Sequence, residues 1–227
     1  GYYDTEAGLN AVVNACYTPL RFWAGKEDAI GLSETGTDII AAGSGCVDNN
    51  MAAYTQSLDG TNSACTFYFD RFYAAINWCN TAIFHAQTVP NPSNDEILAT
   101  TLNKREAEAR VLRTFYYWIL TETFGDTYYT DQPSTSIVMN PVKTSTDNIY
   151  QYMFDDLDWA IKSKLSTLQN DGGRVTIWTA KALKARLLLT RASEKNDVDM
   201  YGQAYDLAKD VIENGPFELA EDFASIW

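Results

Sequence analysis

The sequence holds few of the residue types on which metal sites and nucleophilic enzymes depend. Its 227 residues include one histidine, His85, which excludes a His-rich metal site and weakens any Ser-His-Asp triad. None of the four cysteines forms a C-x-x-C pair, so zinc ribbons and thioredoxin-type redox sites have no support. We therefore expect no metal ion and no other cofactor.

Positive charge and long apolar runs are also scarce. Seventeen Lys and Arg residues stand against 30 Asp and Glu, which gives a formal net charge of −13. An acidic surface repels phosphate backbones, so we expect no nucleic-acid partner. The densest apolar stretch, residues 115–120, is much shorter than the roughly 18 residues of a membrane helix. The first residues do not read as a signal peptide, so we expect either a cytosolic protein or a targeting segment outside this sequence.

The four cysteines divide into two pairs by their surroundings. Cys16 and Cys79 fall on the apolar faces of expected helices and are predicted to be buried thiols. Cys46 and Cys65 flank a polar loop. They are the candidates for a disulfide if the protein is extracytoplasmic.

Helical periodicity dominates what the sequence does contain. Apolar residues recur at helical spacing in six segments, at about 5–20, 69–88, 93–124, 146–165, 176–192 and 199–214. Ser93 and Glu96 have the spacing of a capping box at the start of the third segment, and Gly125 marks its end. Strand patterns are short and occur only near 128–130 and 217–219.

The last helical segment adds a more specific signal. Ala204, Ala208, Val211 and Pro216 have the spacing of the second helix of a tetratricopeptide (TPR) repeat, although the preceding helix does not match in register. The predicted fold class is all-α, with helical hairpins of TPR-like (α-α superhelix) type and long irregular loops.

One long loop, at about 31–63, interrupts the helical pattern. Its residues 41–50 are rich in turn formers, and residues 59–62 give a second turn signal. Loops of this length in compact domains tend to be functional or disordered. We therefore look for binding residues in this loop.

A run of residues in the third helical segment carries a family resemblance. Residues 106–120 read EAEARVLRTFYYWIL, and residues 124–126 read FGD. This run resembles the core motif of the SusD/RagB family, which are glycan-binding lipoproteins of the Bacteroidetes outer membrane. Further blocks match the family in the same order, at 5–10, 34–38, 73–80, 148–160 and 173–186. The resemblance therefore spans nearly the whole chain.

The chain also departs from the family pattern. Where the family follows FGD with an apolar residue and proline, this chain has Thr127, Tyr128 and Tyr129. Family members are roughly double this length, so residues 1–227 resemble their N-terminal, TPR-containing half, with the C-terminal half absent. Cys16 stands within a predicted helix and not in a lipobox, so the lipidated cysteine of the family also lies outside this sequence.

The resemblance implies a surface-exposed binding protein and not an enzyme. Such a protein captures oligosaccharide or polysaccharide at the outer membrane and delivers it to a SusC-like TonB-dependent transporter, on which it sits as a lid. The TPR-like helices would contact the transporter, and the loops would contribute to the sugar site. The membrane would be reached only through the missing lipid anchor.

A sugar site needs aromatic faces for the C–H surface of a pyranose ring, and amide or carboxylate groups for its hydroxyls. The long loop and its exit offer both kinds of group. The candidate ligand-binding residues are Asp38, Asn49, Asn50, Tyr54, Phe67 and Tyr68. For each residue taken singly, the alternative is favoured: the asparagines form turns, and the aromatic rings pack beneath the loop.

Other conspicuous residues have structural explanations that we prefer. Arg110 and Arg113 could bind an anionic sugar, but pairing with buried carboxylates is favoured. The acidic residues at 155, 156 and 158 are expected on a solvated helix face rather than at a cation site. Trp23 and Trp118 are expected in the core, with a smaller chance that Trp23 reaches the ligand.

Two other functions compete with glycan capture. A TPR-like scaffold would bind another protein through a concave helical face and need no sugar site of its own. A glycosidase would use two carboxylates. No motif selects such a pair among the 30 acidic residues, so this alternative ranks last.

Overall fold

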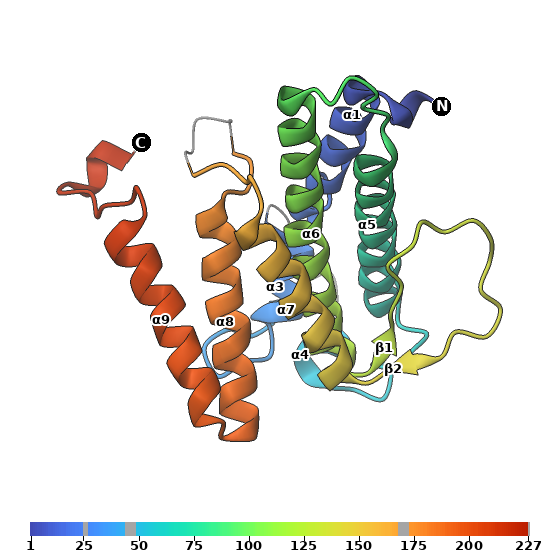
Figure 1. Cartoon of the computed structure of the whole chain (residues 1–227). Coiled ribbons are helices and arrows are strands. Elements are labelled where there is room, and N and C mark those ends of the chain that lie inside the picture. The colour runs from blue at the N-terminus through green and yellow to red at the C-terminus, as the bar shows by residue number, and fades with distance from the viewer. Residues whose placement is uncertain (25–26, 44–48, 168–172, 227) are drawn as a thin grey trace.

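The computed structural model describes residues 1–24, 27–43, 49–167 and 173–226, and this part of the chain is largely helical (Figure 1). Its α-helices are α1 (Glu6–Tyr17), α2 (Leu20–Ala24), α3 (Glu27–Ser33), α4 (Asn49–Ala53), α5 (Ser63–Thr88), α6 (Glu96–Phe124), α7 (Thr146–Lys162), α8 (Ile177–Lys195) and α9 (Val198–Asn214). The 3₁₀ helices Tyr2–Asp4 and Phe223–Ile226 lie near the two ends. The predicted all-α class is confirmed.

The two longest helices, α5 and α6, form the centre of the molecule. They lie antiparallel and side by side, and α1 packs against both (Figure 1). α7 packs against α6, and α8 and α9 follow as a hairpin (Figure 1). The helices thus succeed one another as the hairpins of the predicted TPR-like arrangement.

The core lies where α1, α5, α6 and α7 meet. Its fully buried apolar side chains include Leu9, Val13, Ile76, Leu120, Ile149, Met153 and Leu157. Cys16 and Cys79 are buried thiols in this core, as predicted. Cys46 lies outside the described residues, so its pairing with Cys65 stays a prediction.

Two local predictions are wrong. α6 begins at Glu96 and not at Ser93, because the Asp95 carboxylate caps it by accepting from the backbone N–H groups of Ile97 at 2.8 Å and Leu98 at 3.2 Å. The end of α6 at Gly125, which has a φ of 69°, is as predicted. Residues 217–219 form no strand, because no described segment pairs with them.

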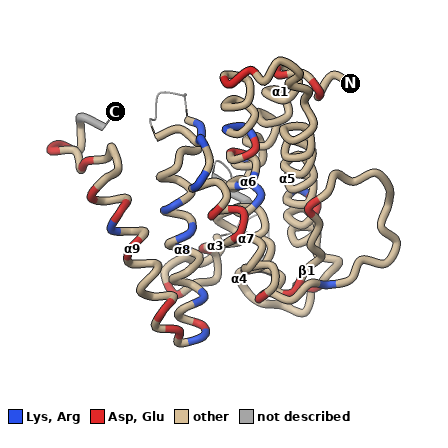
Figure 2. Tube along the Cα trace, in the orientation of Figure 1, with Lys and Arg blue, Asp and Glu red and all other residues tan. Residues whose placement is uncertain are grey.

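One short strand pair follows α6. β1 (Thr127–Tyr128) pairs antiparallel with β2 (Lys143–Thr144), so the strand expected at 128–130 exists one residue earlier and is shorter. The loop that joins β1 and β2 extends away from the helices (Figure 1). This loop carries no charged residue from 132 to 142, whereas charges are spread along the helices (Figure 2).

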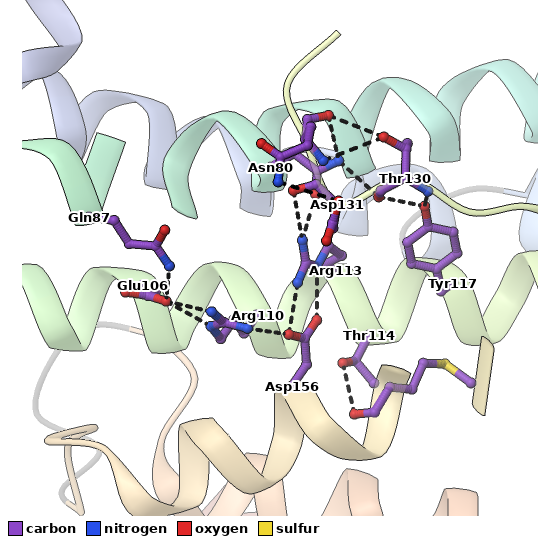
Figure 3. A network of polar contacts seen from close by, with 12 residues as sticks. Asn80, Gln87, Glu106, Arg110, Arg113, Thr114, Tyr117, Thr130, Asp131 and Asp156 are labelled. Atoms are coloured by element: carbon purple, nitrogen blue, oxygen red, sulfur yellow. Dashed lines mark hydrogen bonds and ion pairs between the residues drawn. The ribbon is translucent and has the colours of Figure 1, made fainter. Parts of the chain in front are cut away.

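A buried charge network joins α6 to α7 (Figure 3). Asp156 is 4% exposed, and its carboxylate accepts from Nε and Nη2 of Arg113, both at 2.8 Å, and from Nη1 of Arg110 at 2.6 Å. Arg110 also donates to Glu106. Burial by itself would lower the pKa of Arg113, but the attraction of Asp156 outweighs burial and raises that pKa. The predicted pairing of both arginines is confirmed. The solvated position predicted for Asp156 is wrong, because this carboxylate faces α6.

The same network fixes the chain that follows β1 (Figure 3). Asn80 of α5 accepts from Nη1 of Arg113 at 2.8 Å and donates to the carbonyl oxygens of Thr130 at 3.0 Å and Gln132 at 3.1 Å. The Tyr117 hydroxyl donates to the Thr130 carbonyl at 2.9 Å and accepts from the Thr130 N–H at 2.8 Å. Residues 130–132 are therefore held against α5 and α6.

A second buried carboxylate, Glu108, joins three distant segments. It accepts from the Tyr17 hydroxyl at 2.6 Å and from Nη1 of Arg174 at 2.7 Å. The Val175 N–H donates to the same Tyr17 hydroxyl at 3.0 Å. Burial, with the adjoining Glu108 carboxylate, raises the pKa of Tyr17. The charged side chains of the EAEAR run therefore hold these segments together by hydrogen bonds and ion pairs.

Candidate functional site

The long loop folds against the C-terminal end of α6 and encloses a cleft there. The cleft has a volume of about 480 Å³. Its walls come from α2, α3, the loop, the first turn of α5 at Cys65 and the last two turns of α6. The side chains that line it include Trp23, Leu32, Ser33, Thr35, Tyr54, Leu58, Trp118, Glu122, Thr123 and Phe124. The cleft thus combines three aromatic residue types with hydroxyl groups and a carboxylate.

One glycine allows the first part of the loop to pack closely against α4, the short helix within the same loop. Gly36 has a φ of +90°, and a Cβ at this position would lie 2.9 Å from the carbonyl oxygen of Ala52. The Gly36 N–H donates to the Ile40 carbonyl at 3.0 Å, which closes a tight turn. Only glycine fits such a turn without strain, so the sequence determines this bend locally.

Asn62 fixes the other end of the loop to α5. Its side-chain oxygen accepts from the backbone N–H of Ala64 at 2.9 Å, as an N-cap. Its amide donates to the Ser57 carbonyl at 3.2 Å. One side chain thereby starts α5 and holds the loop segment that carries Tyr54 and Leu58.

Tyr54 is the predicted site residue that lies in the cleft. It is 73% exposed and adopts a φ of +49°, a left-handed conformation that is uncommon for a residue other than glycine. Its ring is therefore displayed to solvent at the edge of the cleft. This is the position that an aromatic contact to a pyranose ring requires.

The remaining polar candidates lie on the loop outside the cleft walls. Asp38 is exposed and follows Thr37, which helps to line a neighbouring hollow of about 530 Å³. Asn50 is half-buried and lies in α4, a helix and not the expected turn, and its side-chain oxygen accepts from the Thr55 hydroxyl at 2.7 Å. Asn49 begins α4, but its side chain lies outside the described part of the structure.

The two aromatic candidates at the loop exit pack against the protein. Tyr68 is 4% exposed and stacks on Phe72 with ring centroids 6.4 Å apart, so it belongs to the core and not to a sugar-binding surface. Phe67 is half-buried, meets Phe22 edge to face at 6.2 Å, and has the Arg71 guanidinium 5.2 Å from its ring centroid. Both rings therefore pack against the protein, as the alternative to sugar binding expects.

Sequence reasoning missed the part of α6 that lines the cleft. Trp118 was expected in the core, but it is half-buried, and its indole N–H has no hydrogen-bond partner among the described residues. Glu122 is exposed and accepts from the Tyr150 hydroxyl at 2.5 Å. Burial, with the Glu122 carboxylate, raises the pKa of Tyr150. No local signal marks these residues, because the cleft is created by a loop that ends 55 positions before Trp118.

Metal ligation and membrane crossing have no support in the described residues. Among them, no group of three or more His, Cys, Asp or Glu side chains is placed to hold a metal ion. No helix in the described part of the chain is long and apolar enough to cross a membrane.

Comparison with known proteins gives a consistent family match. A family model described as starch-binding and associating with the outer membrane matches residues 36–226. A SusD-like protein of Bacteroides ovatus is 28% identical over 162 residues, which are 69% of this chain and 29% of that protein.

Solved structures resemble the whole described fold. A SusD homolog from Bacteroides thetaiotaomicron has a TM-score of 0.82 and 21% identity, covering 100% of this chain and 44% of that one. A laminarin-binding SusD-like protein has a TM-score of 0.77 and 19% identity, covering 97% of this chain and 48% of that one. At these identities the likeness shows the fold alone. The chain spans less than half the length of each of these relatives.

Proposed function

The chain belongs to the SusD-like family, and on that premise we propose that it captures oligosaccharides or polysaccharides at the surface of the outer membrane. The observation that carries the proposal is the cleft between the long loop and α6, with the exposed Tyr54 ring at its edge. Aromatic rings cover the C–H faces of sugars, and the Ser33, Thr35 and Glu122 groups can pair with their hydroxyls. The solved relative described as laminarin-binding makes laminarin a reasonable first ligand to test.

The composition of the cleft favours binding without turnover. Hydrolysis of a glycosidic bond by the usual route requires two carboxyl groups that flank the bond. Of the described residues that line the cleft, Glu122 alone carries a carboxylate. We therefore propose that the protein is non-enzymatic, with a glycosidase as the disfavoured alternative.

Delivery to a SusC-like TonB-dependent transporter is part of the same proposal. The α8–α9 hairpin offers a surface for such a partner, since Leu189, Val198, Tyr205 and Ile212 are all more than half exposed. Exposed apolar groups gathered on one face are typical of interaction surfaces. A lipid anchor would hold the protein at the surface of the outer membrane. The alternative is a TPR-like scaffold that uses this face and binds no sugar.

Isothermal titration against starch, laminarin and xyloglucan tests glycan capture. We expect one of these to bind, and Tyr54→Ala to weaken its affinity about three- to tenfold, as the loss of one aromatic contact does. Tyr205→Ala is the matched control, because Tyr205 is also a well-exposed tyrosine, at 64%, but lies on α9. A reducing-end assay should detect no product. Failure of all three glycans to bind would contradict the proposal, and release of product would favour the glycosidase.

A further inference from the structure

Three tyrosine rings form a stack that runs from the core to the surface. Tyr117 is buried on α6, and its ring centroid lies 5.0 Å from that of Tyr129, with 32° between the planes. Tyr129 stacks in turn on Tyr152 of α7, at 4.2 Å and 23°. Tyr152 is the outermost ring and is 40% exposed.

The inner part of this stack is held rigidly by the network of Figure 3. Tyr117 makes two hydrogen bonds to Thr130, the residue that follows Tyr129, and Asn80 holds the same Thr130 carbonyl. Burial raises the pKa of Tyr129 to about 12, which agrees with its enclosed position between two rings. Tyr129 therefore supports Tyr152 from a fixed backbone.

Tyr152 is partly open to solvent. Among the described rings and cations, only Tyr129 lies against its ring, and the residue is 40% exposed. Asn148 and Asp155 precede and follow Tyr152 on the same face of α7, at positions i−4 and i+3. Both are exposed, and Asp155 accepts from the Gln151 amide at 2.9 Å.

We propose that the Tyr152 ring, flanked by Asn148 and Asp155, is a second saccharide-binding site, on α7 and separate from the cleft of the long loop. A flat ring with an amide on one side and a carboxylate on the other matches the C–H face and the hydroxyls of one pyranose unit. The inference rests on the proposed function, since it assigns the same ligand class to a second surface. Polymers that engage both surfaces would bind more tightly than either surface alone permits.

The test compares tyrosine variants with whichever of starch, laminarin and xyloglucan binds the wild type best. Tyr152→Ala should weaken affinity about three- to tenfold, whereas Tyr152→Phe, which keeps the ring, should leave affinity unchanged. Tyr201→Ala is the matched control, because Tyr201 on α9 is exposed to the same 40%. Amide chemical shifts of residues 148–156 should move when a short oligosaccharide of that glycan is added, and Tyr152→Ala should abolish the movement.

The outcomes separate this site from the cleft. Loss of affinity in Tyr54→Ala but not in Tyr152→Ala, with no shifts at 148–156, would overturn the second site and leave the first. No binding of any glycan by the wild type would overturn both. If Tyr152→Ala is unfolded by circular dichroism, the exposed substitutions Asn148→Ala and Asp155→Ala replace it. Wild-type affinity in both of these would overturn the proposal.

Discussion

The strongest prediction concerns the buried carboxylate of Asp156. Substituting Asp156→Asn removes the negative charge that faces Arg113, whose guanidinium is also buried. Arg110 would keep Glu106 as a partner at 2.7 Å. Of its hydrogen-bond partners among the described residues, Arg113 would keep only the neutral Asn80 side chain and the distant Asp131 carbonyl. One buried positive charge is therefore left without a counter-charge.

The expected loss follows from this geometry. Removing one partner of a buried ion pair costs about 3–5 kcal/mol, because the other charge stays desolvated. For a chain of this size, each kcal/mol lowers the melting temperature by roughly 2–4 °C, so the expected decrease is about 6–20 °C. Replacing both partners by apolar residues, as in Arg113→Met with Asp156→Leu, should cost less than the two single losses added together.

Urea unfolding followed by far-UV circular dichroism measures the effect. Asp155→Asn is the control, since Asp155 is exposed on the same helix and should change the free energy of unfolding by no more than about 0.5 kcal/mol. If the free energy of unfolding of Asp156→Asn lies within about 1 kcal/mol of the wild-type value, the network does not stabilise the fold as its geometry indicates.

Two further predictions concern the loops. Gly36→Ala should strain the turn against Ala52 by about 1–3 kcal/mol, speed amide exchange at residues 34–43 and weaken glycan binding. At Gly43 a Cβ meets nothing within 4 Å, so Gly43→Ala should leave stability, amide exchange and glycan binding unchanged. If the two variants show the same stability, exchange and binding, the role assigned to the Gly36 turn is contradicted. Hydrogen bonds from the Thr146 N–H and hydroxyl lower the pKa of Asp126, so the stability it adds is present above about pH 4 and is lost as pH falls through its lower folded pKa. The urea midpoint should therefore fall less between about pH 5 and pH 3 in Asp126→Asn than in the wild type, and an equal fall would contradict this assignment.

Local patterns decided most of the secondary structure. The stop at Gly125 and the apolar stripes of α5 to α9 are set within a few residues of each position, so the sequence predicts them well. The prediction of where α6 begins was wrong because Ser93 and Asp95 are both good N-cap residues, and their spacing does not choose between them. The prediction of a strand at 217–219 was wrong because a strand needs a pairing partner, which the local sequence pattern does not supply.

The candidate site was predictable only in part. Turn-forming residues identified the loop, and Tyr54 within it lies in the cleft. Aromatic content gave no means of separating Tyr54 from Tyr68, since one ring is displayed and the other is buried by the way α5 packs. No sequence pattern marked Trp118 and Glu122 as site residues, because they line the cleft only when the loop folds over α6.

By itself, the sequence determined the all-α class, the positions of the long helices, the acidic surface and the family blocks, because each depends on residues close together in the chain. The tertiary structure alone decided that Asp156 is buried between two arginines, that Tyr54 and Trp118 share a cleft, and that Tyr117, Tyr129 and Tyr152 form one stack. These groupings join residues from 12 to 64 positions apart, and helix packing, which no local spacing encodes, brings them together.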